Sequence, residues 1–267
     1  MKIVNGCCSP CWRRIAMMDE DRRFRIATYN IHKCRGIGGR ISPDRIIDVI
    51  AELEADVLCL QEVVNAPDSA PKYDQAREIA RSLPGYSSAF GANRPLRGGT
   101  YGNMTLTRLP LVAWRNHDIA RGRGREERGV LHTAIEIGKS EMLHVFNVHL
   151  GTGFMERRFQ AKKLIGPEIL AQPELNGPRI VVGDFNEWTR GLTTKLLQDR
   201  FHSFRPRHAW SYPRTFPGIL PLLTLDHLYY EHPLELMKTR LWRTRRALVA
   251  SDHLPLIADF RASAMTA

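Results

Sequence analysis

The stretch Val181-Val182-Gly183-Asp184-Phe185-Asn186 joins a short apolar strand to a polar end. A β-branched run that stops at glycine predicts a buried strand over 179–182. Taken alone, Asp-Phe-Asn after glycine is typical of an Asx turn. The stretch matters because its construction recurs along the chain.

Five other segments also pair an apolar strand with a carboxylate, an amide or an imidazole. They are Thr28-Tyr29-Asn30-Ile31-His32, Val57-Leu58-Cys59-Leu60-Gln61-Glu62, Asn147-Val148-His149-Leu150, Leu225-Asp226-His227-Leu228 and Ser251-Asp252-His253-Leu254. Layered folds place catalytic groups at strand ends, where the sheet holds them rigidly and the loops leave them accessible. Six such cases are hard to explain as six separate turns, so the sequence predicts one shared site.

The hydrophobic periodicity predicts a layered protein in which strands outnumber helices. Strands are predicted at 24–29, 57–60, 103–107, 130–137, 143–150, 179–182, 225–230 and 254–260, and helices at 43–53, 74–83, 155–165 and 193–199. This order predicts an α/β (α+β) fold. Residues 1–22 are expected to form an irregular extension, and residues 23–262 a single domain.

The composition is that of a globular chain of 267 residues with a net charge of +11. Such a charge favours polyanionic partners, namely nucleic acid, anionic lipid or phosphorylated small molecules, although solvated arginine-rich loops would also produce it. No apolar run reaches the length of a membrane span, and the first residues lack a signal-peptide stretch. We therefore expect a cytoplasmic, bacterial protein without a transmembrane segment; its oligomeric state is not predicted.

The five cysteines are odd in number and irregularly spaced, which argues against a disulfide-stapled secreted fold. Cys59 lies in an apolar run and is predicted to be buried. Cys7, Cys8 and Cys11 could bind a metal or carry a lipid. No second Cys or His pair follows them nearby, so we expect a tail rather than a zinc site.

The polar strand ends include four carboxylates, Glu62, Asp184, Asp226 and Asp252. Four carboxylates brought together would repel and raise one another's pKa values, and a bound divalent cation removes that problem. Oxygen ligands without a Cys/His cluster favour Mg²⁺ or Mn²⁺ over zinc. Such a metal can polarise a phosphoryl oxygen and help to generate a hydroxide.

In this order, the motifs resemble those of the endonuclease/exonuclease/phosphatase superfamily, the DNase I-like proteins. That group includes pancreatic deoxyribonuclease, abasic-site endonucleases, neutral sphingomyelinases and inositol polyphosphate 5-phosphatases. The resemblance runs from about Phe24 to Phe260 and is strongest to small uncharacterised bacterial members, through 28–33, 215–217 and 221–226. It implies a four-layer α/β/β/α sandwich with two packed mixed β-sheets.

The resemblance also implies a metal end of the site. Glu62 would be the main metal ligand, and Asn30 would orient that carboxylate or hold the metal-bound water. Asp252 would be a second ligand or an anchor nearby. Whether one or two metals act is not predicted.

The other end of the site would carry out the proton transfers. Asp184 would activate the attacking water, helped by Asn186, which could also contact the phosphoryl group. His253 would bind or protonate the phosphate, with Asp226 fixing its tautomer, and His149 would donate to a phosphate oxygen. These roles suit in-line attack, which needs a base on one side and charge neutralisation on the other.

Three further residues are weaker candidates for substrate binding: His32, Asn103 and Arg128. Abasic-site endonucleases typically carry an acidic residue where this chain has His32, which weakens the case for that substrate. His32 could contact phosphate or be structural, and Asn103 could brace the site or have a structural role. Arg128 could reach the phosphate as a permanently charged planar donor.

Two arginine-rich segments and one apolar segment bear on the substrate. One arginine-rich segment contains Arg121, Arg123, Arg125 and Arg128. The other contains Arg240, Arg243, Arg245 and Arg246 with Trp242. They could track a nucleic-acid backbone, contact lipid headgroups or simply be solvated loops. The apolar stretch 217–223 would indicate lipid if exposed, but we expect it in the core.

The sequence therefore predicts a Mg²⁺- or Mn²⁺-dependent hydrolase, a phosphodiesterase for which nucleic acid is slightly favoured as the substrate. A lipid (sphingomyelinase-like) or inositol-phosphate phosphoesterase on the same scaffold is the alternative. A non-catalytic binding protein that retains the fold is a third reading, although none of the eight core positions is missing.

Overall fold

The structure is a computed structural model that describes residues 22–96, 98–122, 126–138, 141–188, 191–204 and 213–262. Of the extension expected over 1–22, only Arg22 is described, and it begins the first strand. Cys7, Cys8 and Cys11 lie outside the described residues, as do Arg123 and Arg125. Within those residues, no helix has the length and apolar character needed to cross a bilayer.

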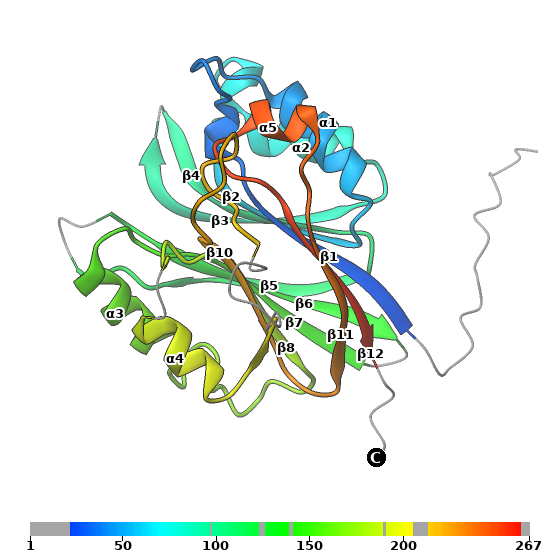
Figure 1. Ribbon diagram of the computed structural model, residues 1–267, viewed down its shortest axis with the longest axis vertical. Helices are drawn as coiled ribbons and strands as arrows, with labels where there is room; N and C mark the ends of the chain where they lie inside the picture. The colour runs from blue at the N-terminus through cyan, green and yellow to red at the C-terminus, as the bar shows by residue number, and fades with distance from the viewer. Residues whose placement is uncertain are drawn as a thin grey trace, which may run out of the picture.

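Two six-stranded mixed sheets form the centre of the described chain (Figure 1). The first has the order β11 (Leu234–Leu241), β12 (Leu256–Ala262), β1 (Arg22–Asn30), β2 (Val57–Asn65), β4 (Gly99–Thr107) and β3 (Ser87–Leu96). The second has the order β5 (Leu111–Asp118), β6 (Gly129–Gly138), β7 (Glu141–His149), β8 (Arg179–Asp184), β10 (Asp226–Tyr230) and β9 (His202–Ser203). Each sheet has one parallel pair at its centre, β1–β2 and β7–β8, flanked by antiparallel strands.

Helices cover the outer face of each sheet (Figure 1). On the first sheet lie α1 (Pro43–Leu53), α2 (Gln75–Ser82) and α5 (Arg245–Ala250), and on the second α3 (Phe154–Leu164) and α4 (Leu192–Gln198). Short 3₁₀ turns occur at His32–Cys34 and Pro71–Tyr73. The four-layer α/β/β/α sandwich is therefore confirmed.

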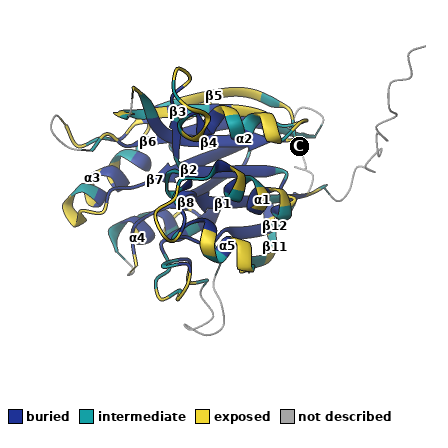
Figure 2. Ribbon diagram, turned by 90° about the horizontal axis from the view of Figure 1, so that it is seen from above, coloured by how far each residue is buried: buried dark blue, intermediate teal, exposed yellow. Residues whose placement is uncertain are grey.

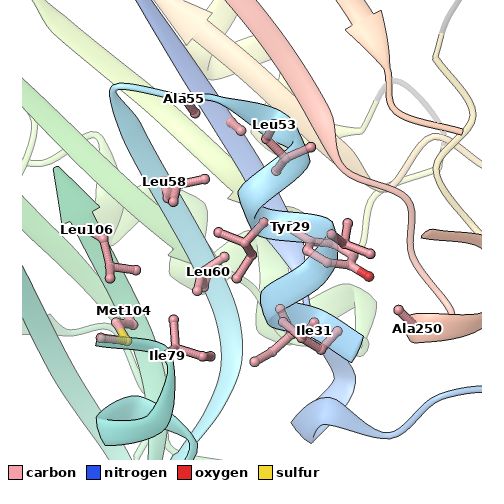
Figure 3. Packing of buried hydrophobic residues seen from close by; sticks show 14 of the residues in the cluster. Tyr29, Ile31, Leu53, Ala55, Leu58, Leu60, Ile79, Met104, Leu106 and Ala250 are labelled. Carbon is pink, nitrogen blue, oxygen red and sulfur yellow. The ribbon is translucent and has the colours of Figure 1, made fainter. Parts of the chain in front are cut away.

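Strand β2 shows why its sequence is apolar at successive positions. Side chains alternate between the two faces of a strand, and both faces of β2 are buried. Leu58 and Leu60 pack under α1, as Figure 3 shows. Val57 and Cys59 point the other way, into the layer between the sheets, and the predicted burial of Cys59 is confirmed.

Strands β3, β5 and β11 and helix α5 were not predicted from the sequence. The three strands lie at or near sheet edges, and β5 in particular is largely exposed, so they lack a clear alternation of apolar and polar residues. Arg245 and Arg246, expected in a loop, begin α5 instead. Thr244 caps that helix by accepting a hydrogen bond from the Ala247 amide at 3.2 Å.

The layer between the sheets contains a buried pair of amide side chains beneath the strand ends. Gln61 Nε2 on β2 donates to Asn147 Oδ1 on β7 at 2.8 Å, which joins the two sheets. Asn147 Nδ2 in turn lies 3.1 Å from the Leu60 carbonyl oxygen and 3.0 Å from that of Met104. Because these groups are fully buried, the bonds fix how the two sheets sit against each other.

Three buried histidines lie side by side on the second sheet, one on each of β5, β6 and β7. His144 Nε2 donates to the Asn176 carbonyl at 3.2 Å, so in neutral His144 the other ring nitrogen accepts from His132 Nε2 at 3.0 Å. His117 stacks on His132 with ring centroids 5.9 Å apart. Burial lowers the pKa of all three imidazoles, and that of His132 to about 3, so the row is neutral at pH 7.

This row predicts acid sensitivity. An unfolded histidine has a pKa near 6.5, so below that pH the unfolded chain binds more protons than the folded one, and stability falls as the pH falls. Between about pH 6.5 and 4.5, His132 alone should reduce the free energy of unfolding by about 2–3 kcal/mol. Urea unfolding of His132→Phe should show a flatter pH dependence. The exposed-site control His202→Phe should keep the wild-type dependence, and an unchanged slope in His132→Phe would contradict the prediction.

Candidate active site

The predicted site residues converge where both parallel strand pairs end. In the first sheet Asn30 is in register with Gln61, and in the second His149 with Asp184. Asp226 begins β10 opposite Asp184. Asn30 Nδ2 donates to Asp184 Oδ2 at 2.9 Å, so the two sheets are joined at the site itself.

Asp184 is the centre of this arrangement and is only 1% exposed. Its Oδ1 accepts from the Asn186 amide at 2.9 Å, which closes the expected Asx turn. Its Oδ2 lies 3.6 Å from His149 Nε2 and 3.8 Å from His253 Nε2. Burial raises the pKa of Asp184 to about 6, against the opposing effect of nearby His253. A carboxylate of this kind can accept a proton near neutral pH.

His253 is held by Asp226, as the resemblance implies. Its Nδ1 donates to Asp226 Oδ2 at 2.9 Å, and both residues are buried. Burial acts to lower the pKa of His253, but Asp226 and Asp184 outweigh it and raise the pKa to about 10. His253 is therefore a cation at neutral pH, oriented with Nε2 towards Asp184.

His149 has the opposite protonation state. Arg128 Nη1 lies 2.8 Å from its Nδ1 and 2.9 Å from its Nε2, and a guanidinium can only donate, so one ring nitrogen accepts and the ring is neutral. Burial and the Arg128 charge together hold the pKa of His149 well below its usual value. Arg128 is itself 5% exposed and donates to Glu126 at 2.7 Å, so in this structure it braces His149.

The two asparagines of the site are oriented by the backbone. Asn186 has a positive φ of 49° and donates its Nδ2 to the Leu150 carbonyl at 2.9 Å. Asn30 accepts from the His32 amide at 3.0 Å through Oδ1 while its Nδ2 binds Asp184. Asn30 was expected to orient Glu62 or metal-bound water; its side-chain bonds instead orient Asp184.

Glu62 lies at a strained position on β2 with a positive φ of 61°. Its carboxylate pairs with the Lys33 ammonium, which also lies 5.5 Å from the Tyr101 ring centroid. Burial acts to raise the pKa of Glu62, but the neighbouring basic groups outweigh it and lower the pKa to about 2. The Lys33 ammonium is the basic group that pairs directly with the carboxylate, and Glu62 remains ionised at neutral pH.

Asp252 and His32 form the more open side of the site. His32 Nδ1 lies 3.3 Å from Asp252 Oδ1, and the two side chains are 31% and 37% exposed. Ser251 Oγ donates to the Asn30 carbonyl at 2.8 Å and so attaches this segment to β1. Asp252 and His32 are therefore more exposed than Asp184 and Asp226.

The donor chemistry fits a hard divalent cation at Glu62. Mg²⁺ is usually held by one or two carboxylates, with water and substrate phosphate oxygens completing its octahedron. Glu62 is ionised, already pairs with a cation and has Asp252 as the other accessible carboxylate. Within the described ranges, no three His, Cys, Asp or Glu side chains lie close enough to enclose a metal ion by themselves.

Asn103, a weaker candidate for substrate binding, lies on β4 and contacts the second sheet. It is fully buried, and its Nδ2 donates to the Gly129 and Asn147 carbonyls, each at 3.1 Å. It therefore braces β4 against the second sheet.

Sequence reasoning missed Lys33, whose position depends on backbone conformation. His32, Lys33 and Cys34 have φ values of 46°, 57° and 54°, a left-handed run of three non-glycine residues. Such conformations cost of order 1–3 kcal/mol each and cluster at functional sites. No periodicity or propensity signals such a turn; the only available sign was a lysine next to a predicted site residue.

Comparison with known proteins identifies this geometry. Residues 27–253 match the model of the Endonuclease/Exonuclease/phosphatase family. The chain is 33% identical over 261 residues to the uncharacterised protein YbhP of Escherichia coli strain K12, covering 91% of this chain and 99% of that protein.

Solved structures give the same fold at lower identity. An endonuclease/exonuclease/phosphatase from Beutenbergia cavernae has a TM-score of 0.72 at 22% identity, over 91% of this chain and 72% of that one. ANGEL2, a 2′,3′-cyclic phosphatase, has a TM-score of 0.66 at 17% identity, over 90% and 95% of the two chains. The chain therefore belongs to the endonuclease/exonuclease/phosphatase family, whose members are phosphoesterases and generally depend on a divalent metal.

Proposed function

We propose that the protein is a divalent-metal-dependent phosphodiesterase that cleaves its substrate by in-line attack of an activated water. The observation that supports this most is the convergence on Asp184 Oδ2 of Asn30, His149 and His253, at 2.9, 3.6 and 3.8 Å. A buried base, a neutral donor and a cation thus share one point at the junction of the sheets.

Each of these groups has a distinct role in the proposed reaction. Asp184, with its raised pKa, accepts the proton of the attacking water. His253 places a positive charge beside the negative charge that develops on the phosphoryl oxygens, and Asp226 keeps it protonated. Neutral His149, braced by Arg128, donates a hydrogen bond to a phosphoryl oxygen.

Glu62, with Asp252 as the second accessible carboxylate, would hold the metal. A divalent cation there supplies Lewis-acid polarisation of the phosphate. Mg²⁺ and Mn²⁺ both match oxygen donors of this kind. Lys33 pairs with Glu62 in this structure, so it would compete with the metal for that carboxylate. Its ammonium is also a further cation that could contact the phosphate.

A phosphodiester substrate agrees with the charge of the chain and with one neighbour. The net charge of +11 favours a polyanion, and nucleic acids and phospholipids both carry phosphodiesters. ANGEL2, which shares the fold, is a 2′,3′-cyclic phosphatase, and a cyclic phosphate is a diester. A non-catalytic binding protein is less well supported, because the eight core residues are retained and the charge states of Asp184 and His253 suit the roles given to them above.

Asp184→Asn should lower kcat on bis-p-nitrophenyl phosphate by roughly 10²–10⁴-fold, because the amide cannot accept the proton of water. The comparison variant is Asp199→Asn, an exposed carboxylate after α4, which should retain wild-type kcat. Circular dichroism of both variants checks the fold. A folded Asp184→Asn protein that keeps full activity would remove Asp184 from the mechanism.

Dialysis against EDTA should abolish hydrolysis, and Mg²⁺ or Mn²⁺ should restore it. Glu62→Gln should weaken Mn²⁺ binding, measured by titration calorimetry, by about tenfold or more, since it replaces a charged oxygen ligand with a neutral one. The matched control Glu174→Gln changes an exposed glutamate and should bind Mn²⁺ like the wild type. Activity that survives EDTA would rule out the metal-dependent mechanism.

A further inference from the structure

Most of the exposed large apolar side chains lie on segments that adjoin the site residues along the chain. Of the twelve large hydrophobic residues exposed in the described chain, nine belong to segments that begin or end at the site residues. We call these nine the apolar rim: Ile37, Phe154, Met155, Phe159, Trp188, Ile219, Leu220, Leu222 and Val249. The other three, Val112, Trp114 and Met237, lie on β5 and β11.

One part of the rim is the start of α3 together with Trp188. Phe154 and Met155 are 59% and 56% exposed, and they follow β7 only a few residues after His149. Trp188, 55% exposed, follows Asn186 by two residues. The Arg157 guanidinium lies 5.4 Å from the Trp188 ring centroid, which connects the tryptophan to α3. Figure 2 shows the exposed surface of α3 in yellow.

The second part is the stretch 217–223, which was expected to lie in the core. That expectation was wrong: Ile219, Leu220 and Leu222 are 58%, 63% and 57% exposed. The stretch is nevertheless ordered by backbone bonds, since the Gly218 amide donates to the Asp252 carbonyl at 2.7 Å. The apolar side chains are thus held beside Asp252 with their surfaces in water.

Ile37 and Val249 extend this second part. The Ile37 amide donates to the Val249 carbonyl at 3.1 Å, so the loop after His32 and the end of α5 lie together. Ile37 is 41% exposed and Val249 44% exposed. Segments that follow site residues of the first sheet and of the second sheet therefore both carry exposed apolar side chains.

Basic residues without a carboxylate partner accompany the rim. Arg40 is exposed in the loop of Ile37, Arg243 precedes α5 and Arg245 begins it, and Arg158 and Lys162 lie on the exposed face of α3. Among the described residues, none of these five forms an ion pair with a carboxylate, whereas Arg246 pairs with Glu52. Six of the nine rim side chains are aliphatic or a thioether, and such side chains accompanied by cations match a bilayer with anionic headgroups. Nucleic acid would favour aromatic platforms along a basic groove, and only three of the nine rim side chains are aromatic.

Resting on the phosphodiesterase function above, we propose that the apolar rim docks on an anionic phospholipid bilayer and that the substrate is the phosphodiester of a lipid headgroup. The rim side chains enter the headgroup–acyl boundary, and Arg40, Arg158, Lys162, Arg243 and Arg245 contact lipid phosphates. Docking brings the plane of headgroup phosphates to the side of the site where Asp252 and His32 are accessible.

Binding can be measured without turnover by giving every protein the additional Asp184→Asn change. The full chain is pelleted with vesicles of phosphatidylglycerol and phosphatidylcholine. We expect Phe154→Ser/Leu220→Ser to lower the partition coefficient by about tenfold or more, since two inserted side chains are lost. The matched control Val112→Ser/Trp114→Ser removes two equally exposed side chains from β5 and should partition like the parent protein.

Quenching by brominated lipid gives a second measurement. Trp188→Phe should remove most of the quenching of tryptophan fluorescence, and Trp114→Phe should leave it unchanged. A partition coefficient that falls equally in the rim and control variants would overturn the proposal. Absence of vesicle binding would also overturn the proposal. Binding of the rim to duplex DNA in a gel shift, or to a second copy of the chain in sedimentation velocity, would then show what occupies it instead.

The two proposals fail in different experiments. Loss of the phosphodiesterase function would appear as no hydrolysis of bis-p-nitrophenyl phosphate, while vesicle binding by the Asp184→Asn protein is independent of catalysis. Hydrolysis of the soluble diester without vesicle binding would overturn only the docking surface.

Discussion

The hydrogen bond from Asn30 to Asp184 is the constraint on which the site depends. It joins the ends of strands from opposite sheets, and it does so at a carboxylate that is almost completely buried. The Gln61–Asn147 bond also joins the two sheets, deeper between them and beneath the strand ends. Because buried polar groups are costly when unpaired, neither sheet can shift without breaking several of these bonds. The rigidity that catalysis requires therefore comes from the packing of the sandwich.

Charge is balanced over the same small region. Asp184 and Asp226 are buried carboxylates on neighbouring strands, and His253 supplies the cation between them. On the other side, Glu126 compensates Arg128, which leaves His149 neutral, and Lys33 compensates Glu62. Asp184 and Asp226 thus share one basic partner, whereas Glu62 has its own. The two histidines beside Asp184 differ in charge because one faces a carboxylate and the other a guanidinium.

Much of this arrangement could be predicted from the sequence because it follows from strand geometry. The strand ends carrying Asp184 and His149 meet because parallel neighbours end at the same edge, and the apolar run at Val57 predicts a strand buried on both faces. The unexpected features depend on contacts that local sequence does not encode. The left-handed turn at Lys33 needs tertiary support, and exposure of Leu220 follows from where the backbone of Gly218 is tied. An apolar stretch looks the same in sequence whether it is buried or not.

The pairing of the first and last described strands affects when the site can assemble during folding. In Figure 1, β1 lies between β2 and β12, and the register runs from Arg22 opposite Ala262 to Thr28 opposite Leu256. Asp252 and His253 stand just ahead of β12, so they reach Asn30 only when that strand docks. During synthesis, β12 must leave the ribosome and pair with β1 before these residues can meet. Assembly of the site therefore waits for the pairing of two strands that lie far apart in the chain.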